Sequence, residues 1–375
     1  MRKYGCPTTS KMLSNRNQFV IASAGSRKTT LLVERALAIT GKRVLLTTYT
    51  NENVGQINAY LVARNGSVPK NIFVVPWYTF LLQEGVRPYQ NHMTQLARVR
   101  SITFEDPPPK AQFAKKTNVD RYFFTNGRDI YGDKVADFVC ECDEASQGLV
   151  VKRLEKIFAH VLIDELQDFA GYDFDLVGKL LRSSISITAA CDPRQATFST
   201  NKSPRNKQFK GERIIKWIEQ QRRAGLLSVE DRTDCHRSNQ IICDFADSLF
   251  PDYPKSVSKN TEITGHDGLF LVPDEQVTHY VRKFNPKILR YSVTTPTMNL
   301  PACNIGVSKG RTYDRVLVFP TKKMVDYLKT GDTSKAGHLA KLYVAATRAR
   351  YSLAFVVQRA DFSPPPNFQL WRAES

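Results

Sequence analysis

Short apolar runs that alternate with helical stretches constrain the fold of this chain more than any other feature. Gly25 and Ser26 end the first run, and a helical pattern follows from Lys28 to Leu37. Apolar strands separated by helices are typical of βαβ units, in which a parallel sheet is buried on both faces. The pattern therefore predicts an α/β fold. The expected strands in the first half of the chain are residues 18–24, 43–48, 71–75, 160–164 and 184–190.

The second half of the chain repeats this organisation. At about 150 residues per domain, a chain of 375 residues is long enough for two domains. We predict a first domain over residues 1–205 and a second over residues 206–375. Residues 85–150 break the strand–helix rhythm and predict an insertion into the first domain, and the basic stretch 201–223 predicts an interdomain segment. The expected strands of the second domain are residues 288–291, 302–306, 315–319 and 352–357.

The charge balance indicates the class of partner. The chain has 54 Lys and Arg against 36 Asp and Glu, a formal net charge of +18, which favours polyanions such as nucleic acid. A generally basic host proteome is the alternative explanation. No window approaches the roughly 18 uncharged apolar residues of a membrane span, and the start Met1–Pro7 has no apolar signal core. We therefore expect a cytoplasmic protein with no membrane partner.

The segment between the first strand and its helix has the composition of a phosphate-binding loop. It reads Ala-Ser-Ala-Gly-Ser-Arg-Lys-Thr-Thr over residues 22–30. Backbone N–H groups at a helix start cradle phosphate oxygens, a Lys reaches the β- and γ-phosphates, and a hydroxyl binds Mg²⁺. Lys28 and Thr29 fit the last two roles. Arg27 occupies the usual glycine position, which leaves two outcomes open: tolerance because the backbone is already helical, or weaker nucleotide binding.

Two adjacent acids follow the fourth apolar run. Asp164 and Glu165 come directly after Val161–Ile163, at the strand end where α/β sheets place ligands. Asp164 is suited to hold Mg²⁺, and Glu165 to orient and deprotonate an attacking water. An acidic helix cap is the alternative interpretation of this pair.

The residues around these motifs resemble the conserved boxes of the UvrD/Rep/PcrA-like helicases of superfamily 1. Asp164-Glu165-Leu166-Gln167-Asp168 resembles the Asp-Glu-x-Gln-Asp box of that family. Other boxes follow in the family's order, and the resemblance spans nearly the whole chain. They are Thr47–Asn51, Trp77–Phe80, Cys191–Gln195, Cys235–Ser238, Ser308–Gly310 and Tyr343–Ala349.

This resemblance implies two RecA-like P-loop NTPase domains with parallel sheets and an ATP cleft between them. It implies ATP and Mg²⁺ as cofactors, with Thr29 and Asp164 holding the metal. The implied catalytic residues are Lys28, Glu165, Gln195, Arg237 and Arg348, the two arginines acting as arginine fingers. The implied nucleotide-binding residues are Ala24, Gly25, Ser26, Arg27, Lys28, Thr29, Thr30, His236 and Gly310.

The same resemblance implies a DNA strand that runs across both domains. Aromatic side chains stack on bases with little sequence preference, which suits movement along single strands. Aromatic residues at strand ends are otherwise mostly part of a core, and for Trp77 both interpretations stay open. The expected DNA-binding residues are Tyr49, Thr50, Asn51, Trp77, Tyr78, Phe198 and Ser308.

The sequence also departs from the family's pattern. The interval between Arg237 and Lys309 is too short for the family's 2B domain, and the 1B insertion is reduced to about residues 85–150. The N-terminal segment lacks the family's adenine box. His236 replaces an adenine-stacking Tyr, and Thr312 replaces an acid that would contact the ribose.

Two functional hypotheses follow from this pattern. The first is a UvrD-like ATP-dependent DNA helicase or translocase that hydrolyses ATP on single-stranded or partly duplex DNA, in the 3′→5′ direction. The alternative is a nucleotide-sensing, DNA-binding regulatory subunit of a nuclease or anti-phage defence complex, without unwinding. The compact form is similar to the helicase-like subunit of Gabija-type anti-phage systems, which suggests a nuclease subunit as partner.

Overall fold

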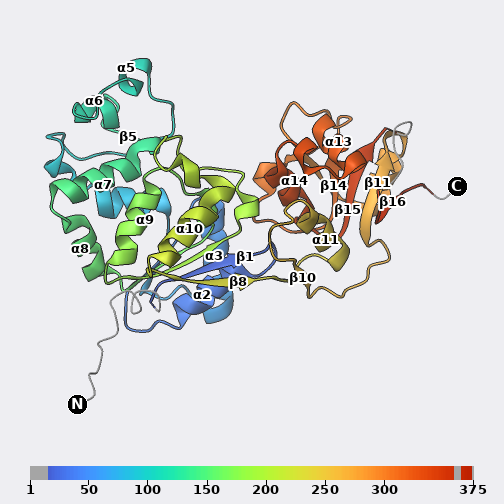
Figure 1. The fold of residues 1–375 in the computed structure, drawn as a ribbon, viewed down its shortest axis with the longest axis horizontal. Helices are drawn as coiled ribbons and strands as arrows, with labels where there is room; N and C mark the ends of the chain where they lie inside the picture. The colour runs from blue at the N-terminus through green and yellow to red at the C-terminus, as the bar shows by residue number, and fades with distance from the viewer. Residues whose placement is uncertain (1–15, 359–364, 374–375) are drawn as a thin grey trace, which may run out of the picture. The chain divides into compact units, whose positions relative to one another are not determined.

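The computed structural model describes residues 16–358 and 365–373 (Figure 1). The segment in which the sequence lacks an adenine box lies, apart from its last two residues, outside the described residues. The chain forms two compact units. The first contains the chain up to Ile21 and Lys28–Asp231, and the second contains Ala22–Arg27 and the chain from Arg232 onward. The boundary expected after residue 205 therefore falls inside the first unit.

A six-stranded sheet forms the centre of the first unit, in the order β3-β2-β6-β7-β1-β8. Every strand pair from β3 through to β1 is parallel. All residues of β2 are buried, as expected for a strand with both faces covered. The strands are β1 (Gln18–Ala22), β2 (Val44–Thr48), β3 (Ile72–Pro76), β6 (His160–Ile163), β7 (Ser186–Cys191) and β8 (Ser228–Arg232).

Helices surround this sheet. The best-defined boundaries belong to α3 (Asn51–Asn65), where the Thr50 hydroxyl caps the start and Gly66, in a left-handed conformation, ends the helix. The other α-helices described in this unit are α2 (Lys28–Leu37), α4 (Trp77–Phe80), α5 (Pro109–Gln112), α6 (Val119–Phe123), α7 (Val135–Ala145), α8 (Leu149–Ile157), α9 (Asp173–Arg182) and α10 (Ile214–Arg223).

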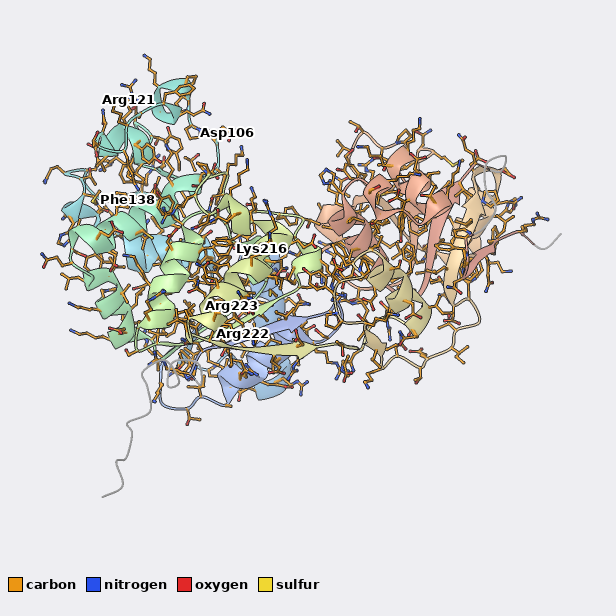
Figure 2. All side chains as sticks on the ribbon, in the orientation of Figure 1. Asp106, Arg121, Phe138, Lys216, Arg222 and Arg223 are labelled. Atoms are coloured by element: carbon orange, nitrogen blue, oxygen red, sulfur yellow. The ribbon has the colours of Figure 1, made fainter. Side chains whose placement is uncertain are left out.

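The segment predicted as an insertion has two different parts. Residues 102–131 contain a small parallel sheet of β4 (Ile102–Thr103) and β5 (Ile130–Tyr131) with α5 and α6 between them. From Val135 onward, α7 packs against α8 and α9, and its Phe138 belongs to the main core. Figure 2 shows Asp106 and Arg121 on the outlying part and Phe138 on α7. Phe123 and Ile130 of the outlying part pack into the same core.

The basic stretch at residues 201–223 ends in a helix of the first unit, so it is not an interdomain segment. Helix α10 buries Ile214, Trp217 and Ile218 in the core, and the Trp217 ring contacts Phe174 with ring centroids 5.2 Å apart. The opposite face carries exposed basic side chains, among them Lys216, Arg222 and Arg223 (Figure 2).

The second unit contains another six-stranded sheet, in the order β13-β12-β14-β15-β11-β16, with every neighbouring pair parallel. A two-stranded parallel sheet joins β9 (Asp234–Cys235) to β10 (Val257–Ser258). The main strands are β11 (Gly268–Pro273), β12 (Lys287–Arg290), β13 (Cys303–Asn304), β14 (Tyr313–Phe319), β15 (Ala349–Val357) and β16 (Phe368–Leu370).

Side chains of β14 alternate between two separate cores. Val316 and Val318 pack into one core, whereas Leu317 and Phe319 pack into the other. This period of two shows that both faces of the sheet are covered, because successive strand side chains point to opposite faces. The helices around the sheet are α11 (Gln240–Ser248), α12 (Val277–Phe284), α13 (Lys322–Thr330) and α14 (Leu339–Ala346).

The predicted α/β class with two parallel sheets is confirmed. Strands β8, β11 and β16 were not predicted, and β11 is entirely buried. Within the described residues, the structure contains no helix with the length and apolar character that crossing a membrane requires.

We expect Leu317→Ala to lower the free energy of unfolding by about 2–5 kcal/mol, because Leu317 is fully buried on a central strand and its loss leaves a cavity. Urea unfolding followed by circular dichroism measures this effect. The control Val293→Ala, at an exposed position, should change stability by less than about 0.5 kcal/mol. Equal effects of the two substitutions would contradict the assignment of this core.

Candidate active site

Three of the predicted boxes begin at the carboxyl ends of adjacent strands. β1 leads into the loop before α2, β6 ends just before Asp164, and β7 ends just before Asp192. Since β7 is paired in parallel with both β1 and β6, these ends lie at one edge of the sheet. Parallel α/β sheets bind ligands at this edge.

A direct hydrogen bond joins the phosphate-loop helix to the acidic pair. Helix α2 begins at Lys28, and Thr29 Oγ1 donates to Asp164 Oδ2 at 2.6 Å. Hydroxyl and carboxylate oxygens are the ligands that Mg²⁺ prefers, and in phosphate sites Mg²⁺ needs only one or two such protein ligands. The residues predicted to hold the metal are therefore adjacent in space, and their chemistry fits Mg²⁺.

The Asp164 carboxyl group has a perturbed pKa. Burial raises this pKa to about 6, and the neighbouring charge of Glu165 adds to the increase. The Thr29 hydroxyl and the Lys28 ammonium group act in the opposite direction, and Lys28 is itself buried. A carboxylate held in this way gains from a nearby cation, because a cation favours its ionised form.

Glu165 has an unusual backbone conformation. Its φ is +57°, in the left-handed region, which is uncommon for a residue other than glycine. Its backbone N–H donates to Asp164 Oδ1 at 3.0 Å, and Gln167 Nε2 donates to Glu165 Oε2. Such strain persists only where the surrounding contacts impose it, and it gathers at functional sites.

Asp192 connects the acidic pair to Gln195. Its two carboxylate oxygens accept from Arg194 Nε at 3.0 Å and from Gln195 Nε2 at 2.9 Å. Its backbone N–H donates to Gln167 Oε1 at 3.2 Å. Burial alone would raise the pKa of Asp192, but the charges of Arg194 and Lys28 hold it below its usual value. Asp192 is therefore a fixed negative charge within the site.

Gln167, Asp192 and Arg194 were not predicted as site residues. All three lie inside boxes that the sequence comparison with superfamily 1 singled out, so their positions carried the necessary signal. In the structure they connect neighbouring side chains through hydrogen bonds, and this connection can be seen only from the three-dimensional contacts.

The phosphate loop before Lys28 has contacts within the second unit. Ala24 N donates to the Tyr343 hydroxyl at 3.3 Å, and His236 N donates to Gly25 O at 3.0 Å. Gly25 has a φ of +79°, and a Cβ atom there would lie 2.8 Å from Cys235 Sγ. Only glycine fits this position. The structure thus brings together three of the predicted boxes around Gly25.

Ser26 and Arg27 complete the loop. Ser26 Oγ is buried and has no hydrogen-bond partner in the described part of the chain, so a phosphate oxygen would satisfy it. Arg27 is exposed and has a φ of +60°. Its backbone is left-handed rather than helical, so of the two outcomes left open, tolerance through a helical backbone does not apply. Arg27 reproduces the conformation that a glycine would adopt there without strain.

The two predicted arginine fingers converge on Thr347 within the second unit. Arg237, which is half-buried, donates from Nη1 to Thr347 O at 2.9 Å. Arg348 is fully buried and donates to Thr347 Oγ1 and to Val344 O, both at 3.1 Å. A role for Arg348 at a phosphate would require release from these oxygens.

The other predicted nucleotide residues lie at accessible positions. Thr30 is half-buried in the first turn of α2, and Gly310 is half-buried in the loop before β14. His236 is exposed, and partial burial together with the charge of Arg27 lowers its pKa. A neutral imidazole is therefore favoured at this position, and such a ring can stack on a base.

Four of the predicted nucleic-acid contacts have accessible atoms. Tyr49 is half-buried and lies edge-on to the Tyr78 ring at a centroid distance of 5.8 Å. Thr50, whose hydroxyl caps α3, is half-buried, and Asn51 is exposed. Phe198 is 42% exposed. Tyr78 is almost completely buried, and its hydroxyl donates to Thr200 O.

The prediction that Trp77 and Ser308 contact DNA is wrong for this structure, because both side chains are fully buried. The Trp77 ring packs on Phe169 with centroids 4.8 Å apart, and Ser308 Oγ donates to Ile305 O at 2.7 Å. Both residues support neighbouring backbone instead of forming a surface.

Trp77 is held by a buried carboxylate. Asp173 Oδ1 accepts from Trp77 Nε1 at 2.8 Å, and Oδ2 accepts from Thr200 Oγ1 at 2.5 Å and from Asn201 Nδ2 at 3.2 Å. Burial raises the pKa of Asp173 to about 6, although these hydrogen bonds oppose the increase. Asp173 thereby joins the aromatic box to the segment that follows Gln195.

Comparisons with known proteins gave matches among solved structures only. No protein-family model matches the chain, and no curated protein matches it. A crystal structure of the arterivirus helicase nonstructural protein 10 is 14% identical with a TM-score of 0.49, covering 93% of this chain and 61% of that one. The complex of this arterivirus helicase with DNA is 15% identical with a TM-score of 0.48, covering 93% of this chain and 62% of that one. The structure of the PRRSV helicase is 16% identical with a TM-score of 0.45, covering 95% of this chain and 56% of that one.

This chain therefore spans less than two thirds of the length of each of these helicases. At this level of similarity, the assignment of a function depends on the residues of this chain.

We expect Arg27→Gly to raise the free energy of unfolding by roughly 0.5–1 kcal/mol, because glycine adopts the left-handed conformation without a Cβ clash. Urea unfolding measures this gain. Lys42→Gly is the matched control, since Lys42 is also an exposed basic loop residue but its φ is not positive. A gain that Lys42→Gly reproduces would contradict strain at Arg27.

We expect stability to depend on pH through Asp173. Its pKa of about 6 lies above the ordinary 3.8, so the folded state binds the proton more tightly than the unfolded state. Stability from this group is therefore gained as pH falls through 6 and lost as pH rises. Lowering the pH from about 7.5 to about 5 should raise the free energy of unfolding of the wild type. This increase should be roughly 1 kcal/mol larger than the change in Asp173→Asn over the same pH range. Urea unfolding at both pH values measures the difference, and parallel pH profiles would contradict the assignment.

Proposed function

We propose that this chain is an ATP-dependent helicase or translocase of the UvrD-like class that hydrolyses ATP when it binds single-stranded DNA and moves 3′→5′. The observation that carries the proposal is the connected set of side chains at one sheet edge. Thr29, Asp164 and Glu165 lie together there, and Gln167 and Asp192 join them to Gln195.

Nucleotide binding follows from the start of α2. The backbone N–H groups there and the Lys28 ammonium group bind the phosphates, while Thr29 Oγ1 and Asp164 Oδ2 hold Mg²⁺. When bound, the metal neutralises charge on the β- and γ-phosphate oxygens. With a pKa of about 6, the Asp164 carboxyl group is mostly ionised near neutral pH.

Hydrolysis uses the groups that surround this position. Glu165 orients a water molecule and accepts its proton, and Gln167 fixes the Glu165 carboxylate by a hydrogen bond. We assign the sensing of the γ-phosphate to Gln195, whose amide group donates a hydrogen bond to Asp192. The resemblance assigns to Arg237, which packs against Gly25 within the second unit, the supply of a permanent positive charge for the transferring phosphoryl group. Arg348 takes this role only after it leaves its present oxygens.

We assign nucleic-acid binding to four accessible residues, Tyr49, Thr50, Asn51 and Phe198. Aromatic faces and a helix start at these residues suit bases and backbone phosphates respectively. The net charge of +18 favours the association of a polyanion.

A second candidate function is a nucleotide-sensing, DNA-binding subunit of a nuclease or anti-phage complex that does not unwind. The left-handed Arg27 in the phosphate loop and the buried guanidinium of Arg348 favour this alternative. It predicts nucleotide-dependent binding of a partner with little DNA-stimulated turnover.

We expect ATP hydrolysis by the purified protein to rise when single-stranded DNA is added. Glu165→Gln should still bind ATP but lower the turnover by about 100-fold or more, because the proton acceptor is lost. Lys28→Ala should lose ATP binding itself. Steady-state phosphate release and equilibrium ATP binding measure these effects.

The matched control is Glu144→Gln, which removes an exposed carboxylate of the same unit outside the site. Its turnover should equal that of the wild type. ATP binding without DNA-stimulated turnover in the wild type would contradict the motor and leave the regulatory subunit.

A further inference from the structure

Phe104 is an exposed aromatic ring that the structure holds in one place. Its side chain is 69% exposed, yet it contacts the Tyr78 ring edge-on at a centroid distance of 5.3 Å. A Cβ atom on Gly132 would lie 2.8 Å from Phe104 Cδ1, so the ring lies directly on the bare backbone of Gly132. A single exposed apolar side chain is common on protein surfaces and needs no explanation. Phe104 differs because Tyr78 and Gly132 hold its ring on two sides while the rest of the ring stays exposed.

This ring extends the aromatic surface already described. Tyr49 contacts Tyr78, and Tyr78 in turn contacts Phe104. Tyr78 is itself fixed, because its hydroxyl donates to Thr200 O and Thr200 is held by Asp173. The three rings therefore form one continuous row from the end of β2 to the segment after β4, with Phe104 as its most exposed member.

Polar contacts hold the backbone around Phe104. Lys202 forms an ion pair with Asp106, and its backbone N–H donates to Asp133 Oδ1 at 3.2 Å. Figure 2 shows Asp106 on the link toward α5. These contacts tie the segment after Phe104 to residue 133, next to Gly132, and to the segment after Gln195.

The charges near the Phe104 ring determine which part of a nucleic acid can contact it. Glu105 follows Phe104 directly, whereas the Asp106 carboxylate is paired with Lys202, so a backbone phosphate beside Glu105 would be repelled. A base has no net charge and presents an apolar face. The ring therefore suits a base, while the cationic surplus of the chain attracts the phosphates elsewhere.

We propose that Phe104 is a base-stacking residue for single-stranded nucleic acid, contributed by the peripheral segment between β4 and β5 to the row of Tyr49 and Tyr78. This inference rests on the proposed function, because it takes the same surface as the path of the strand. Gly132 is the positioning residue for the ring. The chemistry of a base face is shared by DNA and RNA, so the proposal covers both.

The experiment compares the affinities of the wild type and Phe104→Ala for oligothymidylate and oligouridylate, measured by fluorescence anisotropy at one fixed salt concentration. Phe104→Ala should bind at least about fivefold more weakly, since loss of one stacking contact is worth about 1 kcal/mol or more. The matched control is Phe113→Ala. Phe113 is 81% exposed in the same peripheral segment, and its substitution should leave affinity unchanged.

A strand of abasic deoxyribose phosphates separates stacking from a structural effect. The wild type and Phe104→Ala should bind this strand equally, because it offers charge but no base. A loss that persists on the abasic strand, or that Phe113→Ala shares, would overturn the stacking role. Unchanged affinity of Phe104→Ala for both oligonucleotides would also overturn it and would leave a protein partner as the occupant of this surface.

A tryptophan at this position gives an independent readout. Phe104→Trp should retain affinity, and its fluorescence should be quenched when oligothymidylate binds. Binding without quenching would contradict stacking at this ring. Failure of the wild type to bind any single strand would instead contradict the proposed function, so the two failures are distinguishable.

Discussion

The hydrogen bond between Thr29 Oγ1 and Asp164 Oδ2 is the contact on which the rest of the site depends. It joins the first turn of α2 to the end of β6, although β7 lies between β6 and the strand that leads to α2. A hydrogen bond to a charged group contributes about 1.5–3 kcal/mol, and this one also places two hard oxygen ligands side by side. Burial around this contact raises the pKa of the Asp164 carboxyl group to about 6.

A chain of hydrogen bonds extends from this contact to the aromatic surface. Gln167 links Glu165 to Asp192, Asp192 holds Gln195, and Thr200 in the following segment bonds to Asp168 O and to Asp173. Asp173 then holds Trp77, the residue next to Tyr78. Covalent and hydrogen bonds therefore connect the start of α2 to the row of rings. A buried hydrogen-bond network of this kind is rigid only when every polar group in it has a hydrogen-bond partner.

The sequence predicted what depends on local pattern. Apolar runs located most strands, and the helix at residues 28–37 was predicted with its observed bounds, because both signals lie within a few neighbouring residues. Long-range contacts decided the rest. Nothing local distinguishes Trp77, which binds Asp173, from an aromatic residue exposed to a ligand, and nothing local shows that the Arg27 backbone is left-handed. Phe104 was not predicted as a site residue because its assignment depends on its contacts with Tyr78 and Gly132, which are distant in the sequence.

A metal–nucleotide site at Thr29 and Asp164 is tested most simply by the affinity for ATP with and without Mg²⁺. Titration calorimetry measures this affinity in the wild type and in Thr29→Val. The valine keeps the shape of threonine but removes the hydroxyl. We expect the wild type to bind ATP more tightly with Mg²⁺ than without it, and Thr29→Val to lose most of that difference. Equal dependence on Mg²⁺ in both proteins would contradict a metal–nucleotide site at Thr29 and Asp164.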